Sequence, residues 1–395
     1  MLIQNVNQLV KNRDAVLALF LTAICFFLLW APTGFENRQP AGSQYARARI
    51  TALDNARLKQ HVLVKTGFQD LTVEILDGPF QGRTERAVNY LTGKLEIDEF
   101  YLAGQTILLE FSADQGRITT SHPRGVYRLG VEIWLFGLFG VLLIASGGWT
   151  GLRALLSFVF AALMIWKVMV PCFLKGYDPV LLGLAVVTCL IGAVSFLVGG
   201  LNRTGLVTFL GSFIGLNLTY LLSKIFYKLF WVHGAIRPFS EMLLYTGFPH
   251  LDLGKIFLAG IFTASSGAIM DVAMDISVSM HELKLKNPDV SLREHLASGM
   301  AVGRAVIGTM TTTLLLAYSG GYVTMLMVFM GQGIPLRNIF NLNLVSAEVL
   351  DTLVGSFGVV LVAPVTVLIG GLMFRRGPNA AFNQPEVGRN QPELD

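Results

Sequence analysis

Long apolar runs alternate with short polar connections along most of the chain. Eight of these runs reach or approach the roughly 20 residues that a helix needs to cross a bilayer. They are residues 15–31, 133–145, 152–171, 180–199, 206–230, 256–274, 302–330 and 349–374. The pattern predicts a membrane all-α helical bundle of about eight transmembrane helices, with one polar stretch inserted between the first helix and the second.

The polar stretch 32–131 has a different period. Short segments in which apolar and polar residues alternate lie between residues 45 and 110, and Gly or Pro separates them, as at Gly78 and Pro79. Alternation with a period of two is typical of strands, and Gly and Pro between such segments are typical of turns. We expect a small all-β domain, OB-like in size. The predicted organisation is a transmembrane anchor (1–31), this β domain (32–131), a seven-helix transmembrane domain (132–375) and a disordered cytoplasmic tail (376–395).

Basic residues beside the apolar runs predict the orientation. The first run follows Lys11 and Arg13, as in a signal peptide, but no A-x-A cleavage site follows closely, so we interpret it as a retained anchor. With the N-terminus in the cytoplasm, most basic residues of the short loops fall on the cytoplasmic side, as the positive-inside rule requires. We therefore expect a multi-pass protein of the cell membrane, with both termini cytoplasmic and residues 32–131 extracytoplasmic.

Composition excludes two classes of protein. Hydrophobic residues make up 53% of the chain and charged residues 14%, and the mean hydropathy is +0.58, which rules out a water-soluble protein. The net charge of +4 comes mostly from residues beside apolar runs, so it indicates topology rather than nucleic-acid binding. Cys25, Cys172 and Cys189 lack CxxC spacing, and we expect no metal site and no cofactor.

Carboxylates mark the end of the run 256–274. Asp271 and Asp275 lie four residues apart and share one helix face, to which Glu282 nearly returns. A carboxylate at membrane depth is costly unless it faces a polar interior, a counter-ion or water, so it marks a functional site by default. Asp271 is the strongest candidate for binding an ion or a proton, and Ser266 is a candidate for the same path. Alternatively, Asp275 and Glu282 lie at the cytoplasmic interface, where solvation costs little.

A helical hairpin follows these acids. Pro288 breaks the chain, and Ser291 with Glu294 forms an S-x-x-E capping box. These signals predict that the next helix begins at about residue 292 and returns antiparallel to the helix that carries the acids.

The second arm of the hairpin carries polar and small residues. Arg304 stands level with Asp275 and is the natural counter-charge for Asp275 or Asp271, unless it snorkels to the cytoplasmic headgroups. Thr312 lines a polar path or bonds back to the preceding helical turn. Small residues are expected to let helices approach closely on both arms, namely Gly267, Gly299, Gly303 and Gly308.

The last apolar run begins with two further acids. Glu348 and Asp351 are three residues apart on one face, and Pro364 is expected to kink or weaken the helix midway. We include both acids among the candidates for an ion, proton or substrate path. Residues 335–345 are too polar to span and indicate an amphipathic or re-entrant element. The alternative for this region is an interfacial helix without a transport role.

Four segments together resemble a known family. They are residues 74–82, 263–277, 299–321 and 348–366, the second of which contains Asp271 and Asp275. With these segments the chain resembles the YibE/F-like integral membrane proteins of Gram-positive bacteria. The resemblance implies an integral protein of the cell membrane with an exported N-terminal domain, and it implies no particular activity.

Two functional hypotheses remain open. The first is a secondary permease or ion/solute transporter whose intramembrane carboxylates bind a cation or relay protons. The second is a non-catalytic membrane scaffold or accessory subunit whose exported β domain docks a protein partner. An enzyme is disfavoured because the sequence has no HExxH and no Gly-x-Ser-x-Gly motif, so we expect no catalytic residue. The expected partners are the lipid bilayer, a cation or small solute, and a protein at the exported domain.

Overall fold

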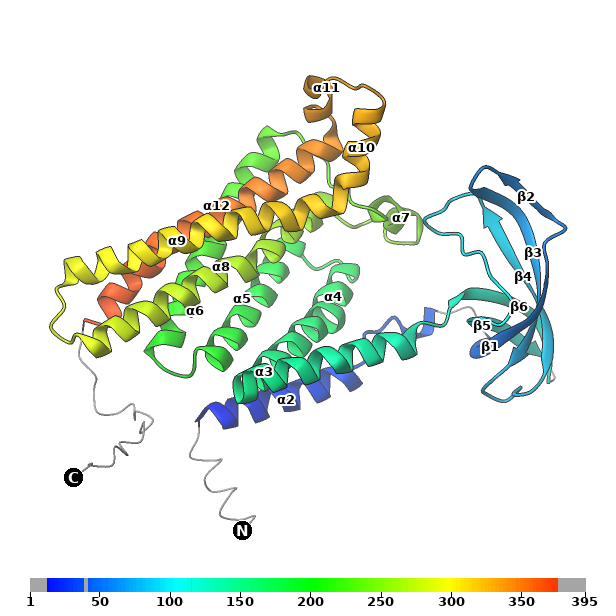
Figure 1. Ribbon diagram of the computed structural model, residues 1–395, viewed down its shortest axis with the longest axis horizontal. Coiled ribbons are helices and arrows are strands. Elements are labelled where there is room, and N and C mark those ends of the chain that lie inside the picture. The colour runs from blue at the N-terminus through cyan, green and yellow to red at the C-terminus, as the bar shows by residue number, and fades with distance from the viewer. Residues whose placement is uncertain (1–12, 39–41, 115, 376–395) are drawn as a thin grey trace, which may run out of the picture. The chain divides into compact units, whose positions relative to one another are not determined.

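The structure is a computed structural model that describes residues 13–38, 42–114 and 116–375. The chain divides into a β unit, Gly34–Leu142, and a helical unit, Met1–Thr33 with Leu143–Asp395. Figure 1 shows the strands of the first and the long helices of the second. Residues 1–12, which include Lys11, and the predicted tail 376–395 lie outside the described residues.

The β unit is built around one antiparallel sheet. Its strands are β1 (Ser43–Asp54), β2 (Leu58–His61), β3 (Val64–Ile75), β4 (Thr84–Thr92), β5 (Thr106–Asp114) and β6 (Arg117–Val126), preceded by a 3-10 turn, η1 (Glu36–Arg38). β3 pairs along one edge with β2 and β1 in succession and along its other edge with β4, and β5 lies between β1 and β6. The sheet curls into a half-barrel, in which Ser121 of β6 donates a hydrogen bond to the Arg86 carbonyl of β4. The all-β prediction is confirmed, whereas this curled six-stranded sheet does not establish an OB-like fold.

The inner face of the half-barrel explains the alternation of apolar and polar residues in the sequence. Apolar side chains at every second position of β1, β3 and β5 point into one core and are almost fully buried; they include Ala48, Ile50, Leu71, Val73, Ile107, Leu109 and Phe111. Successive side chains of a strand point to opposite faces, so the period of two in the sequence becomes one apolar and one polar face.

The helical unit contains long apolar helices joined by short segments. They are α2 (Arg13–Trp30), α3 (Leu129–Leu163, which begins in the β unit), the π-helix η2 (Met164–Met169), α4 (Val170–Leu174), α5 (Pro179–Val198), α6 (Arg203–Leu229), α7 (Ser240–Tyr245), α8 (Leu253–Lys286), α9 (Leu292–Ser319), the 3-10 turn η3 (Gly320–Tyr322), α10 (Val323–Gly331), α11 (Leu336–Phe340) and α12 (Asn343–Met373). Among the described residues, six helical stretches are long and apolar enough to cross a membrane, and a shorter apolar helix, Asp14–Trp30, precedes them. The multi-pass prediction holds, whereas this count is lower than the expected eight.

The difference in count depends on the stretch Leu129–Leu174, which is one of the six. Gly148 has φ 53° and ψ −128°, a conformation that interrupts the helix and that glycine adopts without a steric penalty. A Cβ added to Gly151 would collide with the carbonyl of Leu143, although residues eight apart in a straight helix are about 12 Å apart along the axis. The chain therefore reverses near Gly148, between the predicted spans 133–145 and 152–171.

Helices α6, α8 and α12 pack against one another at the centre of the helical unit, with α5 and α9 beside α8 (Figure 1). Close approach depends on glycines that face hydroxyls. A Cβ on Gly211 would overlap the hydroxyl of Thr366, and a Cβ on Gly358 would overlap that of Thr219. Such small-residue contacts replace the hydrophobic driving force that is missing between helices in lipid.

The hairpin of α8 and α9 follows the sequence prediction, with α8 ending just before Pro288 and α9 beginning at Leu292. The Ser291 hydroxyl accepts from the Glu294 amide and the Glu294 carboxylate accepts from the Ser291 amide, which confirms the capping box. α8 continues twelve residues beyond its apolar run, to Lys286. It continues because Ile276 and Met280 extend the buried apolar face, packing at Gly303 and Gly299 of α9.

The β unit carries a nearly buried carboxylate whose charge should contribute to stability. The Glu110 side chain is 7% exposed and accepts a hydrogen bond from the Arg124 guanidinium, which holds the pKa of this carboxyl below its usual range. We predict that Glu110→Gln destabilises the β unit by about 1–2 kcal/mol at neutral pH. Because the folded pKa is lowered, the wild-type advantage is lost as pH falls, and the difference should shrink between about pH 5 and pH 3.

Hydrogen exchange of β-unit amides in the full-length protein across this pH range measures the difference. The matched control is Glu96→Gln, since Glu96 is exposed on the loop after β4. A wild-type advantage over Glu110→Gln that is as large at pH 3 as at neutral pH would contradict the prediction.

Candidate functional site

A partly buried ion cluster joins the loop after α6 to the first turns of α12. Arg237 Nη1 donates to Glu348 Oε1 at 2.6 Å, and Nη2 donates to Asp351 Oδ2. The side chain of Asp351 is 4% exposed and that of Glu348 is 15% exposed. The guanidinium also lies over the ring of Phe257 on α8, 5.5 Å from its centroid. The cluster thus links three parts of the helical unit.

Local structure places each member of the cluster. Glu348 and Asp351 are three residues apart on α12, so they lie on one face of the helix. The Ser240 hydroxyl at the start of α7 donates to the Arg237 carbonyl at 2.6 Å, which fixes the loop that presents the guanidinium. One guanidinium, on a side chain that is 39% exposed, therefore binds two carboxylates, and its planar group of donors suits such contacts.

The cluster has an excess of acceptors. The oxygen Oδ1 of Asp351 is buried and has no hydrogen-bond partner among the described residues. The hydroxyl oxygens of Tyr318 on α9 and Thr352 on α12 are also buried, and neither has a hydrogen-bond partner among the described residues. Two carboxylates face one guanidinium, so the ionised cluster carries one negative charge in excess. Such a site can take up a proton or a cation.

The predicted pair of acids on α8, Asp271 and Asp275, lies apart from the Arg237 cluster and on a different face of the helical unit. Asp271 and Asp275 are exposed on the surface of the helical unit. Ser265 packs at Gly355 and Met280 at Gly370, so α8 and α12 run parallel. Asp271 is therefore displaced from the level of Asp351 by about ten residues, or roughly 15 Å along the helix. The structure does not bring the two pairs of acids together.

Arg304, the expected counter-charge for Asp271 or Asp275, does not pair with either acid among the described residues. Arg304 is exposed and has no carboxylate within 4 Å among them, so it forms no ion pair with Asp271 or Asp275 there. The exposed hydroxyl of Thr312 bonds back to the Gly308 carbonyl at 3.4 Å. Ser266 likewise donates to the Thr263 carbonyl of its own helix at 2.7 Å.

The four glycines expected at helix contacts divide into two pairs. A Cβ on Gly299 would lie 2.6 Å from the sulfur of Met280, and one on Gly303 would lie 3.2 Å from Ala363 and Ile276, so both are packing positions. Nothing described lies within 4 Å of a Cβ on Gly267 or Gly308, which are exposed. The latter pair faces away from the bundle.

Sequence reasoning missed Arg237, Tyr318 and Thr352 as members of a site. Arg237 lies in the loop between the apolar runs 206–230 and 256–274, which falls on the outer side in the predicted orientation. That position was itself a signal, because the positive-inside rule disfavours a basic residue there unless something holds it. Tyr318 carries no sequence signal of this kind, since its relation to Asp351 depends on how α9 and α12 pack, and Thr352 is one of many hydroxyl residues in the apolar runs.

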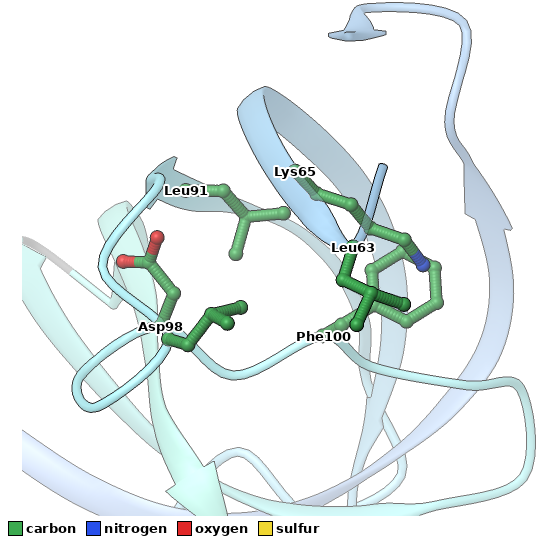
Figure 2. Close-up of a pocket in the computed structure, with 6 residues that line it drawn as sticks. Leu63, Lys65, Leu91, Asp98 and Phe100 are labelled. Atoms are coloured by element: carbon green, nitrogen blue, oxygen red, sulfur yellow. The ribbon is translucent and has the colours of Figure 1, made fainter. Parts of the chain in front are cut away.

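The β unit offers a second, apolar feature. A hollow of about 150 Å³ at one end of the sheet is lined by four apolar residues, Leu63, Leu91, Leu95 and Phe100, and by the charged Lys65 and Asp98 (Figure 2). Lys65 Nζ lies 3.2 Å from the ring centroid of Phe100. Val62 and Leu63 at the adjacent turn are 78% and 76% exposed. We refer to these four lining residues as the apolar hollow.

Comparison with known proteins identifies the helical part. A family model described as YibE/F-like protein matches residues 135–376, more than half of the chain. The chain belongs to this family. The matched residues of this YibE/F-like chain include the Arg237 cluster and both acids of α8, whereas segment 74–82 lies outside them. No curated protein and no solved structure matches significantly.

Metal-binding clusters provide no further site. Within residues 13–38, 42–114 and 116–375, no group of three or more His, Cys, Asp or Glu side chains comes together to hold a metal ion. The Arg237 cluster, with the unpaired oxygen of Asp351, is the candidate functional site of this YibE/F-like protein.

Removing the cation should leave two buried carboxylates uncompensated. We predict that Arg237→Met lowers stability by about 3 kcal/mol, or roughly 6–12 °C in Tm. The triple variant Arg237→Met/Glu348→Gln/Asp351→Asn should recover most of this loss because it removes the charges together. Thermal unfolding of the purified protein in detergent measures both effects.

The matched control is Arg304→Met, because Arg304 is exposed and has no carboxylate within 4 Å among the described residues. Its stability should change by no more than about 0.5 kcal/mol. An equal loss in the two single variants, or a triple variant no more stable than Arg237→Met, would argue against a partly buried ion cluster.

Proposed function

We propose that this YibE/F-like protein is a secondary permease of the cell membrane that moves a cation or a small solute, without covalent chemistry. The observation that carries the proposal is the excess negative charge of the Arg237 cluster at the buried start of α12. An ionisable group inside a transmembrane bundle is expensive and usually marks an ion path or proton relay. One unpaired carboxylate oxygen makes the cluster suited to bind and release a positive charge.

The proposal includes a membrane topology. We infer eight crossings, because the reversal near Gly148 divides the stretch 129–174 into two and the helix Asp14–Trp30 adds another. Basic residues of the short loops favour cytoplasmic termini, with residues 32–131 extracytoplasmic. In this orientation Arg237 and Glu348 lie toward the outer side and Asp275 toward the inner side. The two pairs of acids then lie at different depths of the bilayer.

Flux through liposomes tests the permease. Purified protein in vesicles with an imposed Na⁺ gradient and an internal pH-sensitive dye should move ²²Na⁺ or protons faster than empty vesicles. Asp351→Asn should reduce the initial rate at least roughly tenfold, because the excess charge that attracts the ion is gone. Asp271→Asn should also abolish flux while leaving Tm unchanged, because Asp271 is exposed and unpaired by any described cation.

The control for these variants is Glu241→Gln, a neutralised carboxylate in α7 that lies outside the cluster. Flux equal to that of empty vesicles with folded, inserted wild-type protein would refute the permease for these ions. Loss of folding in Asp271→Asn would instead mark that carboxylate as structural.

A scaffold is the second candidate, favoured by the exposed apolar residues of the β unit. Leu63 and Leu95 of the apolar hollow and the adjacent Val62 are 66–78% exposed, and exposed apolar patches are typical of interaction surfaces. In this case Leu63→Asp/Leu95→Asp should reduce chemical cross-linking to a protein partner in intact cells and leave flux unchanged. A cross-linking pattern identical to that of wild type would remove this surface from consideration.

A further inference from the structure

Three buried oxygens of α9 and α12 have no hydrogen-bond partner in the part of the chain that the structure describes, and one of them belongs to the Asp351 carboxylate that Arg237 binds. They are Asp351 Oδ1, the Tyr318 hydroxyl and Thr352 Oγ1, all without a hydrogen-bond partner among the described residues. Asp351 is 3% exposed and Thr352 is 6% exposed. Most buried polar atoms in proteins are satisfied, so three unsatisfied oxygens in one region indicate that something else binds there.

A glycine makes room for these oxygens to approach one another. Gly355 stands one turn after Asp351 on the same face of α12. The Tyr318 hydroxyl from α9 lies 3.7 Å from the point where a Cβ of Gly355 would stand, and the Cβ of Ser265 from α8 lies 3.3 Å from it. The Tyr318 hydroxyl thus approaches α12 one turn after Asp351, whose other oxygen Arg237 holds.

The charges select what can bind. Glu348 and Asp351 are balanced only in part by Arg237, so the ionised cluster lacks one positive charge. One monovalent cation completes the balance, whereas a divalent cation would leave an excess positive charge in a desolvated site. Carboxylate and hydroxyl oxygens are hard ligands that suit alkali and alkaline-earth ions rather than soft transition metals.

We propose that Asp351, Tyr318 and Thr352 bind one monovalent cation of the Na⁺ class. Arg237 holds the Asp351 carboxylate in place through Oδ2, which leaves Oδ1 directed to the ion. This inference deepens the proposed permease by naming its ion and ligands. Cation binding at equilibrium is measured without transport, so an experiment can reject the cation site without rejecting the permease, or the permease without the site.

Thermal unfolding and ²²Na⁺ binding of the full-length protein in detergent test the site. Tm is compared in NaCl and in N-methyl-D-glucamine chloride at equal ionic strength and neutral pH. A cation that binds only the folded state should raise Tm with concentration. Tyr318→Phe keeps the ring and removes only the hydroxyl, and we expect the apparent Na⁺ affinity to fall roughly tenfold. Thr352→Val should behave in the same way.

Matched controls separate loss of a ligand from general damage. Thr366→Val removes a buried hydroxyl of α12 that donates to the Val362 carbonyl at 2.8 Å, and Tyr245→Phe removes an exposed phenol bonded to Glu241. Both should keep the wild-type dependence on Na⁺. Asp351→Asn should abolish it, and if that variant fails to fold, Tyr318→Phe and Thr352→Val still decide.

Each remaining result has a definite meaning. A wild-type Tm that is the same in both salts overturns the inference, as does a Na⁺ effect that survives undiminished in Tyr318→Phe and Thr352→Val. A Tm that follows pH but not Na⁺, and loses this dependence in Asp351→Asn, assigns a proton to the site and also overturns it. Na⁺ binding without flux in vesicles supports the site and removes the permease.

Discussion

A charge enclosed in a bilayer-spanning bundle needs an opposite charge, and Arg237 provides one for both Glu348 and Asp351. The contact has consequences beyond the pair itself. It ties the loop after α6 to the start of α12, and α12 packs along α6, α8 and α9. Because Phe257 of α8 lies under the same guanidinium, one side chain fixes how the ends of three helices meet.

The acids of the helical unit fall into two physical classes. Glu348 and Asp351 are withdrawn from solvent and bound to a cation, whereas Asp271 and Asp275 are on the surface with no described counter-charge. The sequence presents both as pairs on one helix face, with spacings of three and four residues. What separates them is the neighbouring helices, since α12 turns its pair inward and α8 turns its pair outward. The inward pair can therefore exchange a charge inside the bundle, whereas the outward pair faces the surroundings of the helical unit.

Local signals predicted most of the architecture. Apolar runs indicated the long helices, Ser291 and Glu294 indicated where α9 begins, and alternating residues indicated the β unit. These features depend on periodicity and on contacts three or four residues apart, which a sequence displays directly.

Long-range contacts were the part that the sequence did not reveal. The two partners of Arg237 are more than 100 residues away, and no local pattern identifies them. The G-x-x-x-G signal of Gly299 and Gly303 matched real packing, yet Gly267 and Gly308 face outward, because a small residue does not specify which face of its helix is covered. The number of crossings was equally hard to settle, since Gly148 reverses the chain inside what otherwise looks like one long helix.

The glycine and hydroxyl contacts at the centre also constrain how this protein can evolve. Gly358 and Thr219 occupy one shared space, as do Gly211 and Thr366, so neither glycine can gain a methyl group while its threonine remains. A substitution would be tolerated only if its partner became smaller in the same lineage. Among related chains these positions should therefore covary in pairs, and that covariation would record the packing of α6 on α12 without any structure.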